Sequence, residues 1–286
     1  MPPNFKLNLP SADLFVPDGL PIQQALSRTT HMAIAAHHDD IEIMAAAPIL
    51  ACYQQEDKWF TGVVVSDGRG SPRSGLYEHY RDEQMRLVRI KEQRKAATVG
   101  EYAAQIILDY PSKVIKDGKN QQPVEDLVTL LKAAQPQVVY THNIADKHDT
   151  HVGVALRVIA ALRLLPAAER PQKLYGCEVW RDLDWMVDSD KVAFNVSEHE
   201  NLQAALLGVF DSQIAGGKRY DLASMGRRRT NATYFESHGV DAATSLSYGI
   251  DLTPLITEDD LQVGSYIQAY IQRLAQDVGD RLKRMS

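Results

Sequence analysis

The chain has 286 residues and a mass of 31.9 kDa, with 44% apolar and 24% charged residues. These fractions lie near the globular averages of about 45–50% and 25%, which argues against a disordered chain, a collagen-like repeat or a coiled coil. The net charge of −6 disfavours binding to nucleic acid through phosphate contacts, and no apolar run reaches the roughly 20 residues of a transmembrane helix.

The N-terminal residues and the cysteines both favour a reduced, cytoplasmic protein. A secretory signal has a charged start followed by an apolar stretch, and residues 1–19 do not show this pattern. Cys52 and Cys177 are too few for a disulfide framework or a thiolate zinc site. We therefore expect a cytoplasmic protein, and its composition is compatible with a homo-oligomer.

Residues 1–29 are rich in proline and polar side chains, and we expect them to form an arm that lies over the domain. The arm is followed by a short apolar run, residues 30–36, which is typical of a buried parallel strand. Asp40 is predicted to cap a helix over about residues 41–55, and Pro48 is expected to kink or shorten this helix.

The alternation of strand and helix continues to residue 165. Three more apolar runs predict strands, at residues 63–65, 104–108 and 137–141, and three helical patterns follow them, at residues 78–99, 124–134 and 152–165. Four rounds of strand then helix predict an α/β fold, a doubly wound and mostly parallel sheet with helices on both faces.

The alternation loosens beyond residue 170. This part is expected to hold two strands, at residues 173–180 and 192–196. Two helices are expected at residues 202–210 and 261–284, and an irregular stretch at residues 214–257. We predict one domain over residues 1–286. It consists of the arm (residues 1–29), a core that carries the motifs (30–165) and a C-terminal elaboration (166–286).

Five of the nine histidines fall in two short segments, residues 36–42 and 142–151. The first segment follows the first predicted strand and the second follows the fourth. In the commonest doubly wound strand order, 3-2-1-4, these strands are neighbours, and ligands bind at their carboxyl ends. The two polar segments are therefore expected to meet at the ligand-binding edge of the sheet.

Imidazole and carboxylate groups are the ligands of catalytic zinc sites, which use three protein ligands and leave a fourth position for water. His37 and Asp40 lie three residues apart across a turn, and His151 opens a helix beside the neighbouring strand. These three residues are predicted to bind the metal. Asp39 is then free to act as general base on the water, and His148 can supply a proton or stabilise an oxyanion.

A purely structural role is the alternative for each segment. Asp39 and Asp40 can cap the helix that follows them, and His148 and His151 can be surface residues at a helix start. Because two such segments are expected at adjacent strand ends, we favour the metal site. Without thiolate ligands, the site can accept Fe²⁺, Co²⁺ or Ni²⁺ as well as Zn²⁺.

Four motifs together resemble those of the PIG-L/LmbE-like de-N-acetylases. AHHDDIE at residues 36–42 is similar to that family's AHPDDxE, and HDTH at residues 148–151 is similar to its HPDH. SDGRG at residues 66–70 resembles the family's turn after the second strand, and Arg89 and Glu92, with the Ala96 and Gly100 that follow, resemble its R-x-x-E-x-x-x-A helix. The resemblance spans about residues 30–165.

The resemblance implies a Rossmann-like fold and a zinc hydrolase that removes acetyl groups from N-acetylglucosamine-type sugars. His37, Asp40 and His151 match the family's zinc ligands. Asp39 matches its base and His148 its second catalytic histidine.

The sequence departs from the family pattern at two places. His38 replaces a proline, so we expect a looser turn, or a contact from His38 to substrate or to residues that support the site. Asp149 lies one position before the family's aspartate, and Asp146 is its expected substitute for orienting the catalytic histidine. Asp146 is also a candidate for substrate binding.

Other residues are weaker candidates for substrate binding. Arg89 can reach a sugar hydroxyl or an anion, but an arginine three residues from a glutamate, here Glu92, more often forms a solvated helix pair. Asp67 can line the crevice or serve only as a turn residue. The basic run 227–229 can contact substrate or form a solvated face, and His238 is expected to line the pocket.

The sequence thus predicts a zinc-dependent hydrolase that removes an N-acetyl or other N-acyl group from a small-molecule amino sugar or glycoconjugate. One alternative is an amidohydrolase of the same fold with a non-sugar N-acyl substrate. Another is a metal-binding or sugar-binding protein without turnover.

Overall fold

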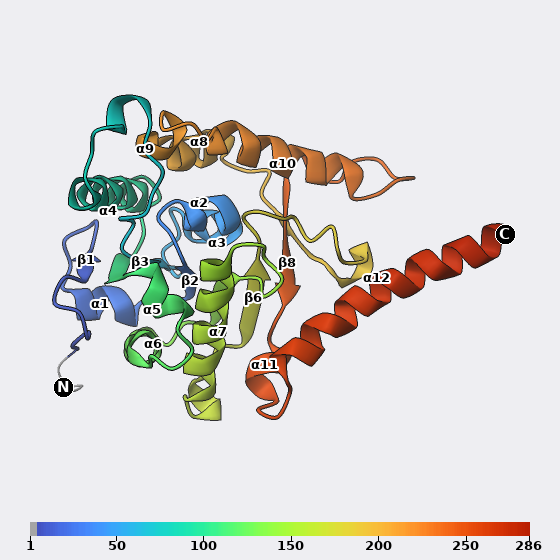
Figure 1. Ribbon diagram of the computed structural model, residues 1–286, viewed down its shortest axis with the longest axis horizontal. Coiled ribbons are helices and arrows are strands. Elements are labelled where there is room, and N and C mark those ends of the chain that lie inside the picture. Colours follow the sequence, from blue (N-terminus) through green and yellow to red (C-terminus); the bar gives the residue numbers. More distant parts are fainter. Residues whose placement is uncertain (1–4) are drawn as a thin grey trace.

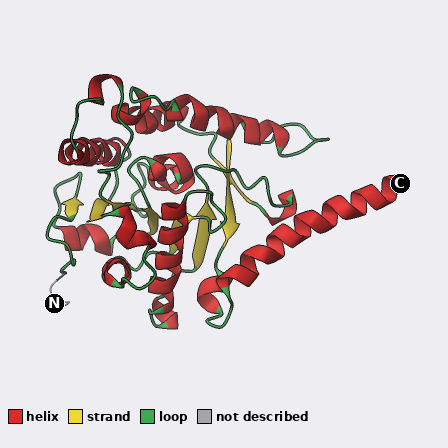
Figure 2. Ribbon diagram, viewed as in Figure 1, coloured by secondary structure: helices red, strands yellow, loops and turns green. Residues whose placement is uncertain are grey.

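The computed structural model describes residues 5–286, which form an eight-stranded, mostly parallel sheet covered by helices on both faces (Figures 1 and 2). The strand order is β1-β4-β3-β2-β5-β6-β8-β7. The strands are β1 (Asp13–Phe15), β2 (His31–Ala35), β3 (Phe60–Ser66), β4 (Ala104–Tyr110), β5 (Val138–His142), β6 (Lys173–Cys177), β7 (Val192–Asn195) and β8 (Leu246–Asp251).

The four strands predicted first lie in the predicted order. β4, β3, β2 and β5 are adjacent and parallel, and Ile34 of β2 is in register with Thr141 of β5. The carboxyl ends of β2 and β5, which precede the two histidine-rich segments, are therefore next to each other. This confirms the α/β, doubly wound sheet and brings the two segments together.

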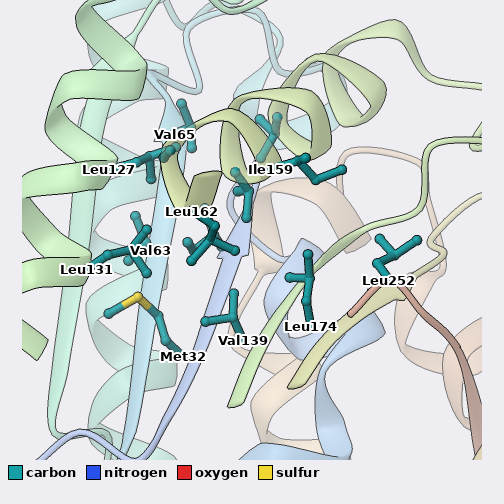
Figure 3. Packing of buried hydrophobic residues seen from close by; sticks show 14 of the residues in the cluster. Met32, Val63, Val65, Leu127, Leu131, Val139, Ile159, Leu162, Leu174 and Leu252 are labelled. Carbon is teal, nitrogen blue, oxygen red and sulfur yellow. The ribbon is translucent and has the colours of Figure 1, made fainter. Parts of the chain in front are cut away.

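Side chains alternate between the two faces of the sheet and enter two separate cores. Figure 3 shows one of them, in which Met32, Val63 and Val139 of the strands pack against Leu127 and Leu162 of the helices. The neighbouring residues Ala33, Val64 and Tyr140 belong to the opposite core. Strands buried on both faces explain the continuous apolar runs in the sequence.

The helices are α1 (Ile22–Ser27), α2 (Asp40–Met44), α3 (Ala46–Cys52), α4 (Asp82–Val99), α5 (Ser112–Lys116), α6 (Gln122–Ala134), α7 (Asp149–Arg163), α8 (Glu200–Gly208), α9 (Asp211–Ile214), α10 (Tyr220–Tyr234), α11 (Pro254–Thr257) and α12 (Val263–Met285). Within residues 5–286, none of them combines the length and apolarity needed to cross a bilayer. The last helix, α12, extends away from the sheet (Figure 1).

The predicted helix over residues 41–55 is two helices, α2 and α3, and the break lies at Ala45 rather than at Pro48. Ala45 leaves the helical region, with φ −116° and ψ 33°. Pro48 is the third residue of α3 and lacks an N–H group. Because its ring would clash with the carbonyl of Met44 in a continuous helix, the chain bends three residues before the proline.

The N-terminal residues contribute to the sheet and to a core, which corrects the expectation of an arm lying over the domain. Residues 1–4 lie outside the described part. β1 adds an antiparallel strand at the edge of β4, and α1 buries Ala25 and Leu26 completely.

The segment predicted to be irregular, residues 214–257, contains α10, β8 and α11. The pattern of apolar residues missed α10 because polar side chains form part of its buried face. Arg228 is 3% exposed and donates hydrogen bonds to the carbonyl oxygens of Glu42 and Ile43, over 2.7 and 3.2 Å. Asn231 is also buried.

Candidate active site and metal centre

A cavity of about 410 Å³ opens at the carboxyl ends of β2, β3 and β5. Both histidine-rich segments line it. The predicted metal and catalytic residues all lie on its wall, at His37, Asp39, Asp40, His148 and His151.

The turn after β2 aims two adjacent carboxylates at this cavity. Asp39 has a φ of 86°, in the left-handed region that aspartate enters more readily than most residues. Its backbone N–H donates to Oε1 of Gln93 over 3.2 Å, which holds the strained residue in place. Asp40 is the first residue of α2 and does not cap it, because its Oδ2 accepts the backbone N–H of His37 over 2.7 Å.

The predicted metal ligands present three atoms at nearly equal separations. Nδ1 of His37 lies 3.2 Å from Oδ2 of Asp40 and 3.1 Å from Nε2 of His151, and the last two atoms are 3.3 Å apart. Ligands at about 2.0–2.1 Å from a tetrahedral zinc ion would lie about 3.3 Å from one another. The donor set and its spacing therefore fit a small divalent cation.

Asp146 supports this arrangement from behind His151. Its Oδ2 lies 3.0 Å from Nδ1 of His151, which leaves Nε2 of the same ring directed at Asp40. Such a carboxylate–histidine pair fixes the tautomer and orientation of a metal-binding imidazole. Although burial lowers the pKa of His151, Asp40 and Asp146 together raise it to about 10. Burial would raise the pKa of Asp40, but His151 and the other histidines hold it well below its usual range.

His142, the last residue of β5, was not singled out from the sequence and lies in the same group. Its Nε2 is 3.3 Å from Oδ2 of Asp40, which is close enough for a ligand. However, this nitrogen accepts the backbone N–H of Ala36 over 2.8 Å, so its lone pair is already used. Burial, with His151 nearby, lowers the pKa of His142 to about 4. We therefore assign it a supporting role, as a neutral contact to the turn.

Arg89 connects α4 to Asp39. The residue is 1% exposed, so the prediction of a solvated helix pair is wrong. The guanidinium contacts Oδ2 of Asp39 and Oε2 of Glu92, each over 3.2 Å, and donates to the carbonyl oxygen of His38. Burial raises the pKa of Asp39 to about 6, while Arg89 acts in the opposite direction.

His148 is the N-cap residue of α7. Its Nδ1 accepts the backbone N–H of Thr150 over 3.3 Å, so Nε2 is the nitrogen that can carry a proton. The ring lies 4.9 Å from the ring of His37 and 4.6 Å from that of His151, between centroids. Burial and the neighbouring histidines lower the pKa of His148.

Neither aspartate considered as a partner for the His148 ring contacts it. Asp149 is exposed, and Asp146 bonds to the ring of His151 and to the backbone N–H of His148. The predicted substrate contact from Asp146 is also wrong, because its side chain is fully buried behind His151.

Two more of the predicted substrate contacts do not reach the cavity. His38 is fully buried beneath Gly68. A Cβ atom added to Gly68 would lie 3.0 Å from the imidazole ring of His38. Burial and Arg89 lower the pKa of His38 well below its usual value. His238 is exposed in the loop after α10 and is not part of the cavity wall. Asp67 does line the cavity and accepts two bonds from Arg69, over 3.0 and 3.1 Å.

The basic run 227–229 does not act as one surface. Arg227 donates to the carbonyl oxygen of Val179, Arg228 is buried against α2, and Arg229 forms an exposed ion pair with Glu200. The C-terminal part instead supplies five cavity residues without a sequence signal, Val179, Trp180, Gln213, Lys218 and Tyr220.

Comparisons with known proteins agree with this geometry. The family model for PIG-L, GlcNAc-PI de-N-acetylase, matches residues 32–162. A search of curated proteins found no match.

Solved structures with the same fold were found at low sequence identity. A conserved protein from Thermus thermophilus has a TM-score of 0.62 and 18% identity, with 82% of this chain and all of that chain covered. The 4-carboxy-2-hydroxymuconate hydratase of Pseudomonas putida has a TM-score of 0.59 and 13% identity, with 78% and 96% covered. The N,N'-diacetylchitobiose deacetylase of Pyrococcus horikoshii has a TM-score of 0.57 and 16% identity, with 77% and 83% covered.

The predicted family resemblance and Rossmann-like fold are therefore confirmed. The matched segment contains both histidine-rich segments and every residue of the proposed metal and catalytic centre. Residues 32–162 of this chain match the family model for PIG-L, GlcNAc-PI de-N-acetylase.

Proposed function

We propose that the protein is a zinc-dependent hydrolase that removes an N-acetyl group from an amino sugar or glycoconjugate. One observation carries the proposal. Three metal-type donors converge within 3.3 Å of one another on the wall of a cavity that Asp39 and His148 also line.

His37, Asp40 and His151 would hold the metal, which supplies a Lewis acid for the amide carbonyl and for a water molecule. Asp39 would accept a proton from that water as its oxygen bonds to the carbonyl carbon. Arg89 holds the Asp39 carboxylate in place during this step. When the C–N bond breaks, the proton held by Asp39 would pass to the leaving nitrogen, and the Nε2–H of His148 would hydrogen-bond the oxyanion that forms at the carbonyl. The products are acetate and a free amine.

Two alternatives differ from this proposal, one in its substrate and the other in that the protein binds its ligand without turnover. Because a hydratase shares the fold, the fold alone does not decide the reaction. A non-sugar N-acyl substrate would use the same centre with a different cavity wall. The half-buried ring of Trp180 supports the sugar assignment, since an aromatic face can stack on the apolar face of a pyranose. A binding protein without turnover would leave Asp39 without a function.

The test is release of acetate from a panel of N-acetylated sugars and N-acetylated amino acids. We expect release from sugars, its loss with a chelator and its return with Zn²⁺. The Asp39→Ala variant separates an enzyme from a binding protein, since only an enzyme loses activity while metal stays bound. No release from any compound by metal-loaded protein would contradict the proposal.

A further inference from the structure

Helix α12 carries an exposed apolar seam. Ile267, at its base, is the one residue of the helix that is buried, whereas Ile271, Val278, Leu282 and Met285 are 46–77% exposed. At 3.6 residues per turn, the apolar residues fall within an arc of about 80°. We call these residues the α12 seam: Ile267, Ile271, Leu274, Val278, Leu282 and Met285.

The outer part of α12 exposes apolar side chains to solvent. It extends beyond the body of the molecule (Figures 1 and 2). Isolated helices of this length are marginal in water, and packing of an apolar face normally supplies their stability. Ile271, Leu274, Val278 and Met285 are separated by 3, 4 and 7 residues, which are core spacings of a heptad repeat with Arg281 at the position between the last two. Such a repeat is the pattern of a helix that packs against another helix.

We propose that this seam pairs with the same seam of a second copy of the chain, with the two helices antiparallel. The flanking charges favour this occupant. In the register that places Val278 beside Arg281 of the second copy, Leu274 faces Met285 and Asp277 faces Arg284. The two-fold axis repeats each contact, so two such ion pairs form.

A parallel pair would lack this complementarity. Arg281 occupies a position at the edge of the seam, and in a parallel pair it would face Arg281 of the second copy. Asp277 would face Leu282 instead of a cation. In the monomer Asp277 bonds only to Arg281 of its own helix, over 2.9 Å, among the ion pairs of residues 5–286. The carboxylate is exposed enough to accept a second cation.

A membrane surface fits the helix less well. Helices that lie on membranes have a wide apolar face, often with Trp or Phe, and a polar face rich in Lys and Arg. The α12 seam is narrow, and residues 271–286 contain neither Trp nor Phe. Asp277 and Asp280 add negative charge to the polar side.

Sedimentation velocity over a range of protein concentrations tests the proposal on the full chain. We expect a reversible shift from 31.9 kDa towards twice that mass. Val278→Lys places an ammonium group against Arg281 of the second copy and should abolish the shift. Gln276→Lys adds the same charge on the opposite side of the helix and should leave the shift unchanged.

Charge reversal and cross-linking test the register. Asp277→Arg and Arg284→Asp should each weaken association, and the double variant should restore it. The intrahelical bond to Arg281 is lost in both the single Asp277→Arg and the double variant, so the restoration reports the intermolecular pair. Leu274→Cys mixed with Met285→Cys should form a disulfide-linked dimer, whereas Leu274→Cys alone should not.

Several results would overturn the proposal. A single 31.9 kDa species at every concentration would exclude pairing, and a dimer that survives Val278→Lys would place the interface elsewhere. Cross-linking of Leu274→Cys alone would indicate a parallel pair. Monomeric protein that binds anionic vesicles through the seam would assign the helix to a membrane.

Discussion

Replacing Glu42 by glutamine should stabilise the protein at neutral pH, and the gain should disappear in mild acid. Glu42 lies on α2, two residues after Asp40, and is 1% exposed. Its Oε1 accepts the hydroxyl of Tyr102 over 2.9 Å and the side-chain amide of Gln93 over 2.8 Å. Its Oε2 has no hydrogen-bond partner within the described chain.

The magnitude follows from the pKa of this carboxyl. Burial raises the pKa of Glu42 from 4.5 to about 8, because the charged form loses its solvation. Below pH 4.5 both the folded and the unfolded states hold the proton. As the pH rises towards 8, the unfolded state releases its proton first, so the stability contributed by the neutral carboxyl is lost over this window. Between pH 4.5 and pH 7 the loss is on the order of 3 kcal/mol.

The glutamine variant has no proton to lose, and its carbonyl can accept both bonds that Oε1 accepts. We therefore expect the free energy of unfolding of the variant, minus that of the wild type, to rise by about 3 kcal/mol from pH 4.5 to pH 7. Urea unfolding with chelator present measures both proteins without metal. Taking the difference cancels all other titrating groups to first order.

The exposed Glu56 supplies a matched control. Glu56→Gln changes the same functional group without changing a buried one, so its difference from wild type should not depend on pH. If the Glu42→Gln difference were equally flat, Glu42 would be ionised in the folded protein, and the argument from burial would be refuted.

Three further outcomes concern the active site. Asp39→Asn should lower kcat by at least about 10²-fold, the usual contribution of a general base, while metal stays bound and KM changes much less. Asparagine tolerates the left-handed backbone, so this loss could not be blamed on misfolding, and turnover within a few-fold of wild type would refute the role of Asp39. His37→Ala, Asp40→Ala and His151→Ala should each lower the metal content in elemental analysis, whereas Asp39→Ala should keep it; the opposite result for the two aspartates would reverse their roles. Asp146→Asn should weaken metal binding by about 10–100-fold in competition with a chromophoric chelator, and unchanged affinity would show that Asp146 does not orient His151.

The position of the site was predictable from sequence because it depends on strand ends. Short apolar runs mark the buried strands, and polar segments directly after neighbouring parallel strands must share one edge of the sheet. The order β4, β3, β2, β5 and the convergence of His37 with His151 follow from this argument. The ligand assignment itself stays a prediction until metal is measured.

Residues whose role depends on distant backbone were not predictable. His142 has the same chemistry as His151, but the N–H of Ala36 occupies its nitrogen, and only the folded sheet brings that group near. The helix α10 was missed for a related reason. Its inward side includes Arg228, whose hydrogen-bond partners on α2 lie 185 and 186 residues away in the sequence. A pattern of apolar residues cannot report such a contact.

The contacts of Arg228 also set the order in which the catalytic centre can be completed during synthesis. The guanidinium binds the backbone of α2, the helix that begins with Asp40, and the backbone N–H of Ser212 donates to Glu92, which holds Arg89. Ribosomes add about 5–20 residues per second, so the 77 residues from His151 to Arg228 require about 4–15 s. During that interval the proposed metal ligands have all been made, but α2 still lacks the arginine that donates to its carbonyl groups. We therefore expect a fragment that ends near residue 165 to bind metal more weakly than the full chain in competition with a chromophoric chelator, although it still contains Arg89 and Gln93, which contact Asp39.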